Sequence, residues 1–396
     1  MVVDTSVQPF RVETSQPVLD DLRDRLSHTR FPDEVEGTGW DSGTNLDYMM
    51  ELVDYWLNRF DWRAREAELN RFAHYRADID GMGIHFIHER GKGPDPLPII
   101  LTHGWPDSFY RYAKIIPMLT DPAAHGGDPA DAFDVVVPSM PGYGFSDRPH
   151  ERGMTSARIA EIWGRLMTDV LGYKRFAAGG GDIGSGVSRF LALGHPGSII
   201  GLHLTDMGFI PLGVDIPDLS ENERRYFDAI QQLWTQEGGY NMMQSTKPQT
   251  LAYGLNDSPA GLAAWIVEKF RSWSDCGGDI ERRFSKDELL TNIMIYWTTE
   301  TIGSSVRLYY ENVHALPLDF LKERIEVPVG MAVFPKDFIP PPREWVERRL
   351  NVERWTEMPR GGHFTAMEEP DLFVRDIRGF FRPLRAEYRE VLGVSI

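Results

Sequence analysis

"RFAAGGGDIGSGVSRFLALGHPG", residues 175–197, contains an apolar run, a cluster of glycines around one aspartate, and a second apolar stretch that ends at a glycine and a proline. This order predicts a β-strand, a tight turn and an α-helix. Gly180 and Gly184 stand two residues before and two residues after Asp182, where a strand and a helix that cross closely need small residues. The stretch therefore predicts a strained turn that exposes the Asp182 carboxylate.

The turn has the pattern of a nucleophile elbow, with Asp182 at the position where hydrolases usually carry serine. The helix that follows would direct backbone N–H groups and the positive end of its dipole at the carboxylate, which favours the ionised form. Two other interpretations of residues 179–186 alone stay open. One is a flexible glycine-rich turn with a solvated aspartate, and the other is a phosphate-binding loop, although the pattern GxxxxGK[ST] is absent.

Continuous apolar runs that are typical of buried parallel strands surround the elbow. Helical stretches separate these runs, which occupy residues 97–105, 133–144, 175–182, 199–207, 327–335 and 352–364. Earlier in the chain, the alternating runs on either side of Asp80-Gly81 predict a β-hairpin. These patterns predict an α/β protein with an α/β-hydrolase fold, whose sheet is interrupted by a long insertion.

The chain divides into four segments. Residues 1–71 form an N-terminal helical segment, and residues 72–212 and 318–396 form the two parts of the α/β-hydrolase core. Residues 213–317 are helical and rich in Trp, Tyr and Met, and we interpret them as a cap over the sheet. Because two helices seldom make a core alone, we expect the N-terminal segment to pack on the hydrolase core.

The composition limits the partners and the compartment. A formal net charge of -17 argues against a nucleic-acid partner, because a polyanion would be repelled, and a small or neutral substrate fits better. Cys276 is the only cysteine, which excludes an intrachain disulfide and favours a reducing compartment. The N-terminus lacks the pattern of a signal peptide and no apolar run reaches the roughly 18 residues of a membrane helix, so we expect a cytoplasmic protein without a membrane partner.

Candidate partners of Asp182 follow it in the order nucleophile, acid and histidine that such an elbow requires. His363 lies in the loop RGGHF after the last predicted strand, where flanking glycines let the loop turn back over the sheet. Asp337 follows the preceding strand and can orient the His363 imidazole. Asp206, which follows the run LHLT, is the competing acid.

The motif HGWP, residues 103–106, follows an earlier predicted strand, where this architecture supplies the second N–H group of an oxyanion hole. We assign the hole to the backbone N–H groups of Trp105 and Ile183. The alternative is that Trp105 only packs in the core, but its position on a loop beside a proline makes it a poor core candidate.

Together these motifs resemble those of the epoxide hydrolases of the microsomal type. HGWP, GGxD, two cap tyrosines, FPK(D/E) and RGGHF occur in the order of that family over nearly the full chain. The resemblance implies that Asp182 is the nucleophile, Asp337 the acid and His363 the base, and that the cap tyrosines are Tyr240 and Tyr309. It also implies that an epoxide and water become a vicinal diol through an alkyl ester of Asp182.

The sequence departs from the family in three places. Ile183 replaces the tryptophan that often follows the nucleophile, and Tyr310 stands beside Tyr309 as an alternative proton donor. A helix lets only one of two neighbours face the substrate, and the resemblance to the family's motif favours Tyr309. The membrane-bound members carry an N-terminal hydrophobic anchor that this sequence lacks, so we expect a soluble form.

Two alternative functions follow from the same residues. A haloalkane dehalogenase uses the same aspartate chemistry, but Ile183 removes one expected N–H donor to a halide, and paired tyrosines favour an oxygen leaving group. A non-catalytic protein of this fold would bind small molecules under the cap, although the joint presence of Asp182, Asp337 and His363 argues against it.

The expected partner is a small-molecule epoxide, with no cofactor and no metal, and HExxH spacing is absent. Trp234, Trp265 and Trp297 in the cap suggest an apolar or aryl substrate, although such residues are more often part of the core. The sequence leaves open the identity of the epoxide, the regio- and enantioselectivity, a role in detoxification or biosynthesis, and whether the chain forms a homodimer.

Overall fold

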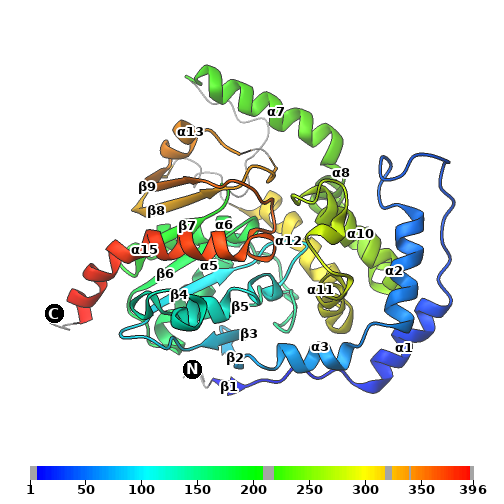
Figure 1. Ribbon diagram of the computed structural model, residues 1–396, viewed down its shortest axis with the longest axis horizontal. Coiled ribbons are helices and arrows are strands. Elements are labelled where there is room, and N and C mark those ends of the chain that lie inside the picture. Colours follow the sequence, from blue (N-terminus) through cyan, green and yellow to red (C-terminus); the bar gives the residue numbers. More distant parts are fainter. Residues whose placement is uncertain (1–6, 208–217, 317–322, 339, 393–396) are drawn as a thin grey trace.

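The computed structural model describes residues 7–207, 218–316, 323–338 and 340–392, which form a mixed β-sheet flanked by helices (Figure 1). Within these residues the sheet has nine strands in the order β1-β2-β3-β5-β4-β6-β7-β8-β9. The strands are β1 (Gln8–Pro9), β2 (His74–Ile79), β3 (Met82–Glu89), β4 (Leu97–Thr102), β5 (Phe133–Pro138), β6 (Phe176–Gly180), β7 (Ile199–Leu204), β8 (Ile325–Val333) and β9 (Leu350–Glu357). The pairs from β5 to β9 are parallel and β2 pairs antiparallel with β3, which confirms the predicted parallel strands and the hairpin at Asp80-Gly81.

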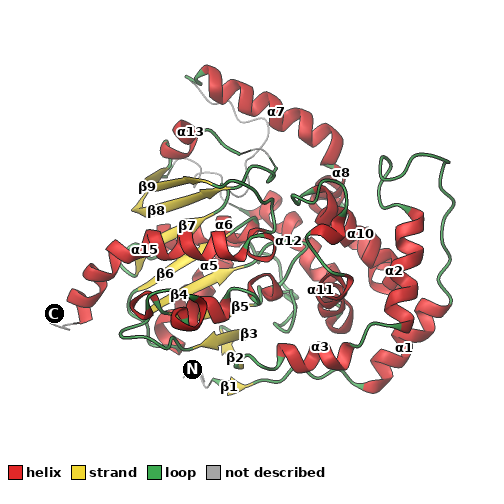
Figure 2. Cartoon of the chain, in the orientation of Figure 1, coloured by secondary structure: helices red, strands yellow, loops and turns green. Residues whose placement is uncertain are grey.

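Helices cover both faces of the parallel part of the sheet, and β4, β5 and β7 are buried along their whole length (Figure 2). These strands are rich in Val, Ile and Leu, as expected where neither face of a sheet meets water. The helices of this part of the chain are α4 (Ile116–Thr120), α5 (Ser156–Arg165), α6 (Ile183–Gly194), α13 (Arg343–Glu347), α14 (Thr365–Glu368) and α15 (Pro370–Leu392). No helix in the described ranges combines the length and the apolar character that crossing a membrane requires.

A group of helices lies between β7 and β8, where the sequence predicted a cap. They are α7 (Glu221–Glu237), α8 (Gly239–Thr246), α9 (Pro248–Asp257), α10 (Pro259–Ser272), α11 (Lys286–Thr299) and α12 (Ile302–Ala315). The N-terminus of α11 is fixed by a capping box, in which Ser285 and Glu288 each bind the backbone N–H group of the other. The predicted boundaries of the cap, at residues 213 and 317, lie outside the described residues.

The N-terminal segment joins the rest of the molecule in two ways. Its strand β1 pairs with β2 at the edge of the sheet. Its helices α1 (Gln16–Ser27), α2 (Leu46–Asn58) and α3 (Trp62–Leu69) pack on α10 and α11, beside which they lie in Figure 1. The sequence predicted that this segment packs on the hydrolase core, and β1 does join the core sheet. Its helices pack on the insertion, where every residue of α11 from Leu289 to Trp297 is buried.

Candidate active site

The elbow between β6 and α6 holds Asp182 in a strained conformation. Its φ of 58° and ψ of -129° are rare for a residue with a side chain. A Cβ at Gly180 would lie 2.6 Å from the backbone of Gly184, and a Cβ at Gly184 would overlap the carbonyl of Thr102. The backbone N–H group of Asp182 donates to Asp206 Oδ2 at 2.6 Å, which holds the turn in place. The steric reason that the sequence suggested for the two glycines is confirmed.

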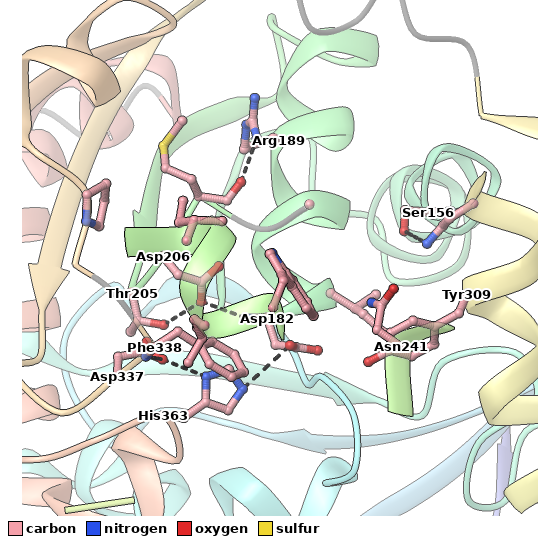
Figure 3. A pocket seen from close by; sticks show the side chains of 18 of the residues that line it. Ser156, Asp182, Arg189, Thr205, Asp206, Asn241, Tyr309, Asp337, Phe338 and His363 are labelled. Atoms are coloured by element: carbon pink, nitrogen blue, oxygen red, sulfur yellow. Dashed lines mark hydrogen bonds and ion pairs between the residues drawn. The ribbon is translucent and has the colours of Figure 1, made fainter. Parts of the chain in front are cut away.

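His363 and the two candidate acids meet the elbow at the same edge of the sheet (Figure 3). His363 Nδ1 lies 2.8 Å from Asp337 Oδ1, and His363 Nε2 lies 3.5 Å from Asp182 Oδ2. Asp337 follows β8 and His363 follows β9, so the carboxyl ends of two neighbouring parallel strands bring them together. Asp206 binds the backbone of Asp182, and its carboxylate forms no direct bond to the imidazole.

The charges in this group set the protonation states. Burial alone would lower the pKa of His363, but the carboxylates of Asp337 and Asp182 raise it to about 10. Burial alone would raise the pKa of Asp182, but His363 and the backbone N–H groups of Ile183 and Trp105 lower it. The free site therefore holds an ionised Asp182 carboxylate beside an imidazolium.

The two backbone N–H groups predicted for an oxyanion hole do face Asp182. The N–H group of Trp105 donates to Asp182 Oδ1 at 3.0 Å, and the N–H group of Ile183 contributes to lowering the pKa of this carboxylate. The prediction that Trp105 is a poor core candidate is wrong, because its side chain is fully buried. Its ring stacks on Tyr240 at 5.5 Å between ring centroids, so a helix of the insertion covers the loop that the sequence alone would leave exposed.

The tyrosines reach the site from two helices of the insertion. Tyr240 on α8 and Tyr309 on α12 line the same cavity as Asp182, with their ring centroids 6.1 Å apart. Tyr310 stacks on His314 at 3.9 Å and is not among the residues that line this cavity. Burial and the charge of Asp182 raise the pKa of Tyr240 well above its ordinary value, and burial likewise raises the pKa of Tyr309. Both phenols are therefore protonated and can donate.

The cavity has an empty volume of about 1370 Å³, including its opening to solvent. Much of its lining beyond the charged group is apolar and includes Ile230, Leu233, Trp234 and Phe338. Of the three cap tryptophans considered from the sequence, Trp234 lines the cavity and the other two do not. An apolar cavity of this kind excludes water and strengthens the interactions between the charged groups inside it.

Two charged side chains that sequence reasoning missed fix the loop of His363. Arg111 is fully buried, pairs with Asp107 and donates to the backbone carbonyl of His363 at 2.6 Å. Asp107 and Arg111 stand four residues apart directly after HGWP, a spacing that could have signalled a buried ion pair. Glu368, in the run TAMEEP after His363, binds the same loop from the other side.

Comparisons with known proteins show which family the chain is similar to. A family model described as "Epoxide hydrolase N terminus" matches residues 7–112, and one described as "alpha/beta hydrolase fold" matches residues 98–244. The chain is 46% identical to a Stigmatella aurantiaca protein that carries a provisional epoxide hydrolase name, over 96% of this chain and 86% of that protein. It is 39% identical to "Epoxide hydrolase 1" of Sus scrofa, over 95% of this chain and 89% of that protein. The solved structure of juvenile hormone epoxide hydrolase from the silkworm Bombyx mori matches with a TM-score of 0.84 at 30% identity, covering 97% of this chain and 95% of that one.

Proposed function

The chain belongs to the epoxide hydrolase family and is itself an epoxide hydrolase, and on that premise we propose that it forms its vicinal diol through an alkyl ester on Asp182. The family and the fold expected from the sequence motifs are confirmed by the matches. One observation carries the proposed mechanism: an ionised carboxylate, an imidazole bound to a second carboxylate, and two phenols border a single cavity.

The first step is attack of an Asp182 carboxylate oxygen on one carbon of the epoxide. A C–O bond to Asp182 forms, the strained ring bond breaks, and its electron pair stays on the epoxide oxygen as an alkoxide. Tyr240 and Tyr309 hydrogen-bond this oxygen as it gains charge, and one phenol transfers its proton to it. Because burial keeps both phenols protonated, the donors are ready before the substrate enters.

The second step is attack of water on the carbonyl carbon of the ester. His363 accepts a proton from the water, Asp337 stabilises the imidazolium, and the N–H groups of Trp105 and Ile183 hold the oxyanion. Esterification removes the negative charge of Asp182, so the pKa of His363 falls after the first step and its proton passes to the phenolate, which leaves the imidazole neutral before water attacks. The bond between the carbonyl carbon and the diol oxygen then breaks, and that oxygen takes the second proton of the attacking water. The diol leaves, and the ionised Asp182 carboxylate again lies beside the imidazolium of the free site.

We predict that ester hydrolysis accelerates as the pH rises. In the free enzyme Asp337 and Asp182 raise the pKa of His363 to about 10, and the ester retains only Asp337, so His363 in the ester titrates below that value. Under single-turnover conditions from about pH 5 to about pH 9, the rate constant of ester decay should rise and then level off as the imidazole becomes neutral. A rate constant that falls with pH, or does not change, would contradict the role of His363 as base.

We predict that loss of the cap phenols slows ester formation more than ester hydrolysis, since only the first step produces an alkoxide. Tyr240→Phe and Tyr309→Phe should each slow ester formation about 10- to 100-fold, and the double variant at least about 1000-fold. Tyr310→Phe is the matched control and should behave as the parent, because Tyr310 packs on His314. Rapid-quench measurement of the ester separates the two steps, and near-parent ester formation in the double variant would refute the donor assignment.

The substrate class is tested with a panel of styrene-type, aliphatic and terpenoid epoxides. We propose an apolar epoxide, a proposal that the apolar lining around Trp234 and Phe338 supports. Diol should form with the parent and not with Asp182→Asn, and a 1-haloalkane in the same assay should release no halide.

We further propose a cytoplasmic location, which the single cysteine supports. A homodimer and a role in detoxification or biosynthesis stay predictions.

A further inference from the structure

The N–H group and the carbonyl group of the His363 backbone both form hydrogen bonds. Its N–H group donates to the carbonyl of Trp273 at 2.8 Å, and its carbonyl accepts from Arg111 Nη2 at 2.6 Å. The imidazole forms a hydrogen bond through Nδ1 to Asp337 and an ion pair through Nε2 with Asp182. The position of Nε2 over Asp182 therefore depends on a loop that must not shift.

Glu368 binds this loop on both sides of the histidine. Its Oε1 accepts from the N–H group of Phe364 at 2.9 Å, and its Oε2 accepts from the N–H groups of Gly362 at 3.0 Å and Asp275 at 2.8 Å. The residue is 8% exposed and is not among those that line the cavity. Burial raises the pKa of Glu368 to about 7, although the three backbone N–H groups act to lower it. Above about pH 7 the ionised carboxylate makes charge-assisted bonds with these groups, which are stronger than those between neutral groups.

The third of these bonds reaches the helical insertion, because Asp275 lies in the segment after α10. The ring of Trp273 in the same segment lies 5.0 Å from the ring of Tyr240 and 5.3 Å from the ring of His363, measured between centroids. One short segment of the insertion thus borders both the proton donor of the first step and the base of the second. Glu368 ties the histidine loop to that segment.

We propose that Glu368 is a positioning residue for the second step, whose carboxylate holds the His363 loop against residues 273–275 so that Nε2 can reach the water that attacks the ester. This inference rests on the two-step mechanism proposed above. Glu368 is not among the residues that line the substrate cavity, so its effect on ester hydrolysis is exerted through the position of His363.

Glu369 provides a matched control. It is 5% exposed and belongs to the same run of sequence, but its carboxylate bonds to the side chains of Arg283 and Arg360, each at 2.7 Å. Loss of its charge disturbs the same region without removing an acceptor from the neighbours of His363. A merely structural role for Glu368 would make the two variants resemble each other.

The test measures ester formation and ester decay separately, by rapid quench and intact-protein mass spectrometry, in the parent, Glu368→Gln and Glu369→Gln. The glutamine amide turns an NH2 group towards backbone N–H donors, so Glu368→Gln should slow ester decay about 10- to 100-fold, while ester formation stays within about threefold of the parent. Glu369→Gln should leave the ratio of the two rate constants unchanged. The ester that accumulates on Glu368→Gln itself demonstrates a folded site.

Equal losses in both steps for Glu368→Gln, or the same selective loss in Glu369→Gln, would overturn the proposal. Should the glutamine variant fail to fold, Glu368→Asp keeps the charge but shortens the side chain. It should then show a smaller selective loss of ester decay, and a parent-like ratio would equally refute the positioning role. Absence of an ester in the parent would instead refute the mechanism on which the proposal rests, so the two failures are distinguishable.

Discussion

His363→Gln will accumulate the Asp182 ester. After incubation with an epoxide that the parent hydrolyses, the intact mass of the variant should rise by the mass of one substrate molecule. The Asp182 carboxylate, the N–H group of Trp105 and the phenols of the insertion are unchanged, so ring opening proceeds. The group assigned to take a proton from water is lost, so steady-state turnover should fall at least about 1000-fold.

A second buried histidine provides the control. His203 Nε2 lies 2.9 Å from Asp376 Oδ2, and neither residue lines the cavity. His203→Gln therefore disturbs a buried histidine–aspartate pair without touching the proposed chemistry, and it should show no mass increase after substrate is consumed. If His363→Gln keeps an unmodified mass while remaining folded, the two-step scheme is wrong, and direct attack of water on the epoxide becomes the better hypothesis.

The elbow could be predicted from sequence because its determinants are local. Gly180, Asp182 and Gly184 stand in one turn, and the neighbouring apolar runs identify the strand and helix that it joins. The choice of Tyr309 over Tyr310 came from the resemblance to the family's motif, because helix geometry predicts only that the two neighbours face different directions. The cavity-lining position of Tyr309 and the packing of Tyr310 on His314 agree with that choice.

The choice between the two candidate acids, Asp206 and Asp337, could not be made from a local sequence pattern. Asp206 and Asp337 follow β7 and β8, which are neighbours in the sheet, and each stands within reach of the elbow. Their roles differ by which bond each makes: Asp206 accepts the N–H group of Asp182, and Asp337 binds the imidazole of His363. The exact position at which each strand ends decides which bond its aspartate makes, and a sequence pattern does not show this position.

Contacts between distant segments explain the features that the sequence did not predict. Trp105 looked like an exposed loop residue because the ring that covers it, Tyr240, lies far away in the sequence, within the insertion. The contact of the N-terminal helices with α10 and α11 likewise joins segments far apart in the sequence, which a local pattern does not show. The role of Glu368 depends likewise on Asp275, 93 positions away.

The origin of the oxygen in the diol gives the largest expected effect. With enzyme in excess over epoxide in water labelled with heavy oxygen, the oxygen added in the first turnover should be light in nearly all of the diol. It comes from the Asp182 carboxylate, because the bond that forms in the first step is never broken and water attacks the carbonyl carbon of the ester. The heavy oxygen should then be found in the peptide that contains Asp182. Direct attack by activated water would give a fully labelled diol from the start.

The labelled protein supplies its own control. Enzyme recovered from that single turnover and given fresh epoxide in ordinary water should release some diol that carries heavy oxygen, since only the Asp182 carboxylate holds the label. The amount of labelled diol depends on which of the two carboxylate oxygens attacks the epoxide. These oxygens differ in their surroundings, because Oδ1 accepts from the N–H group of Trp105 and Oδ2 pairs with His363 Nε2. Heavy oxygen that never enters the Asp182 peptide would remove the carboxylate from the role of nucleophile. The glycines around it would then serve only the turn.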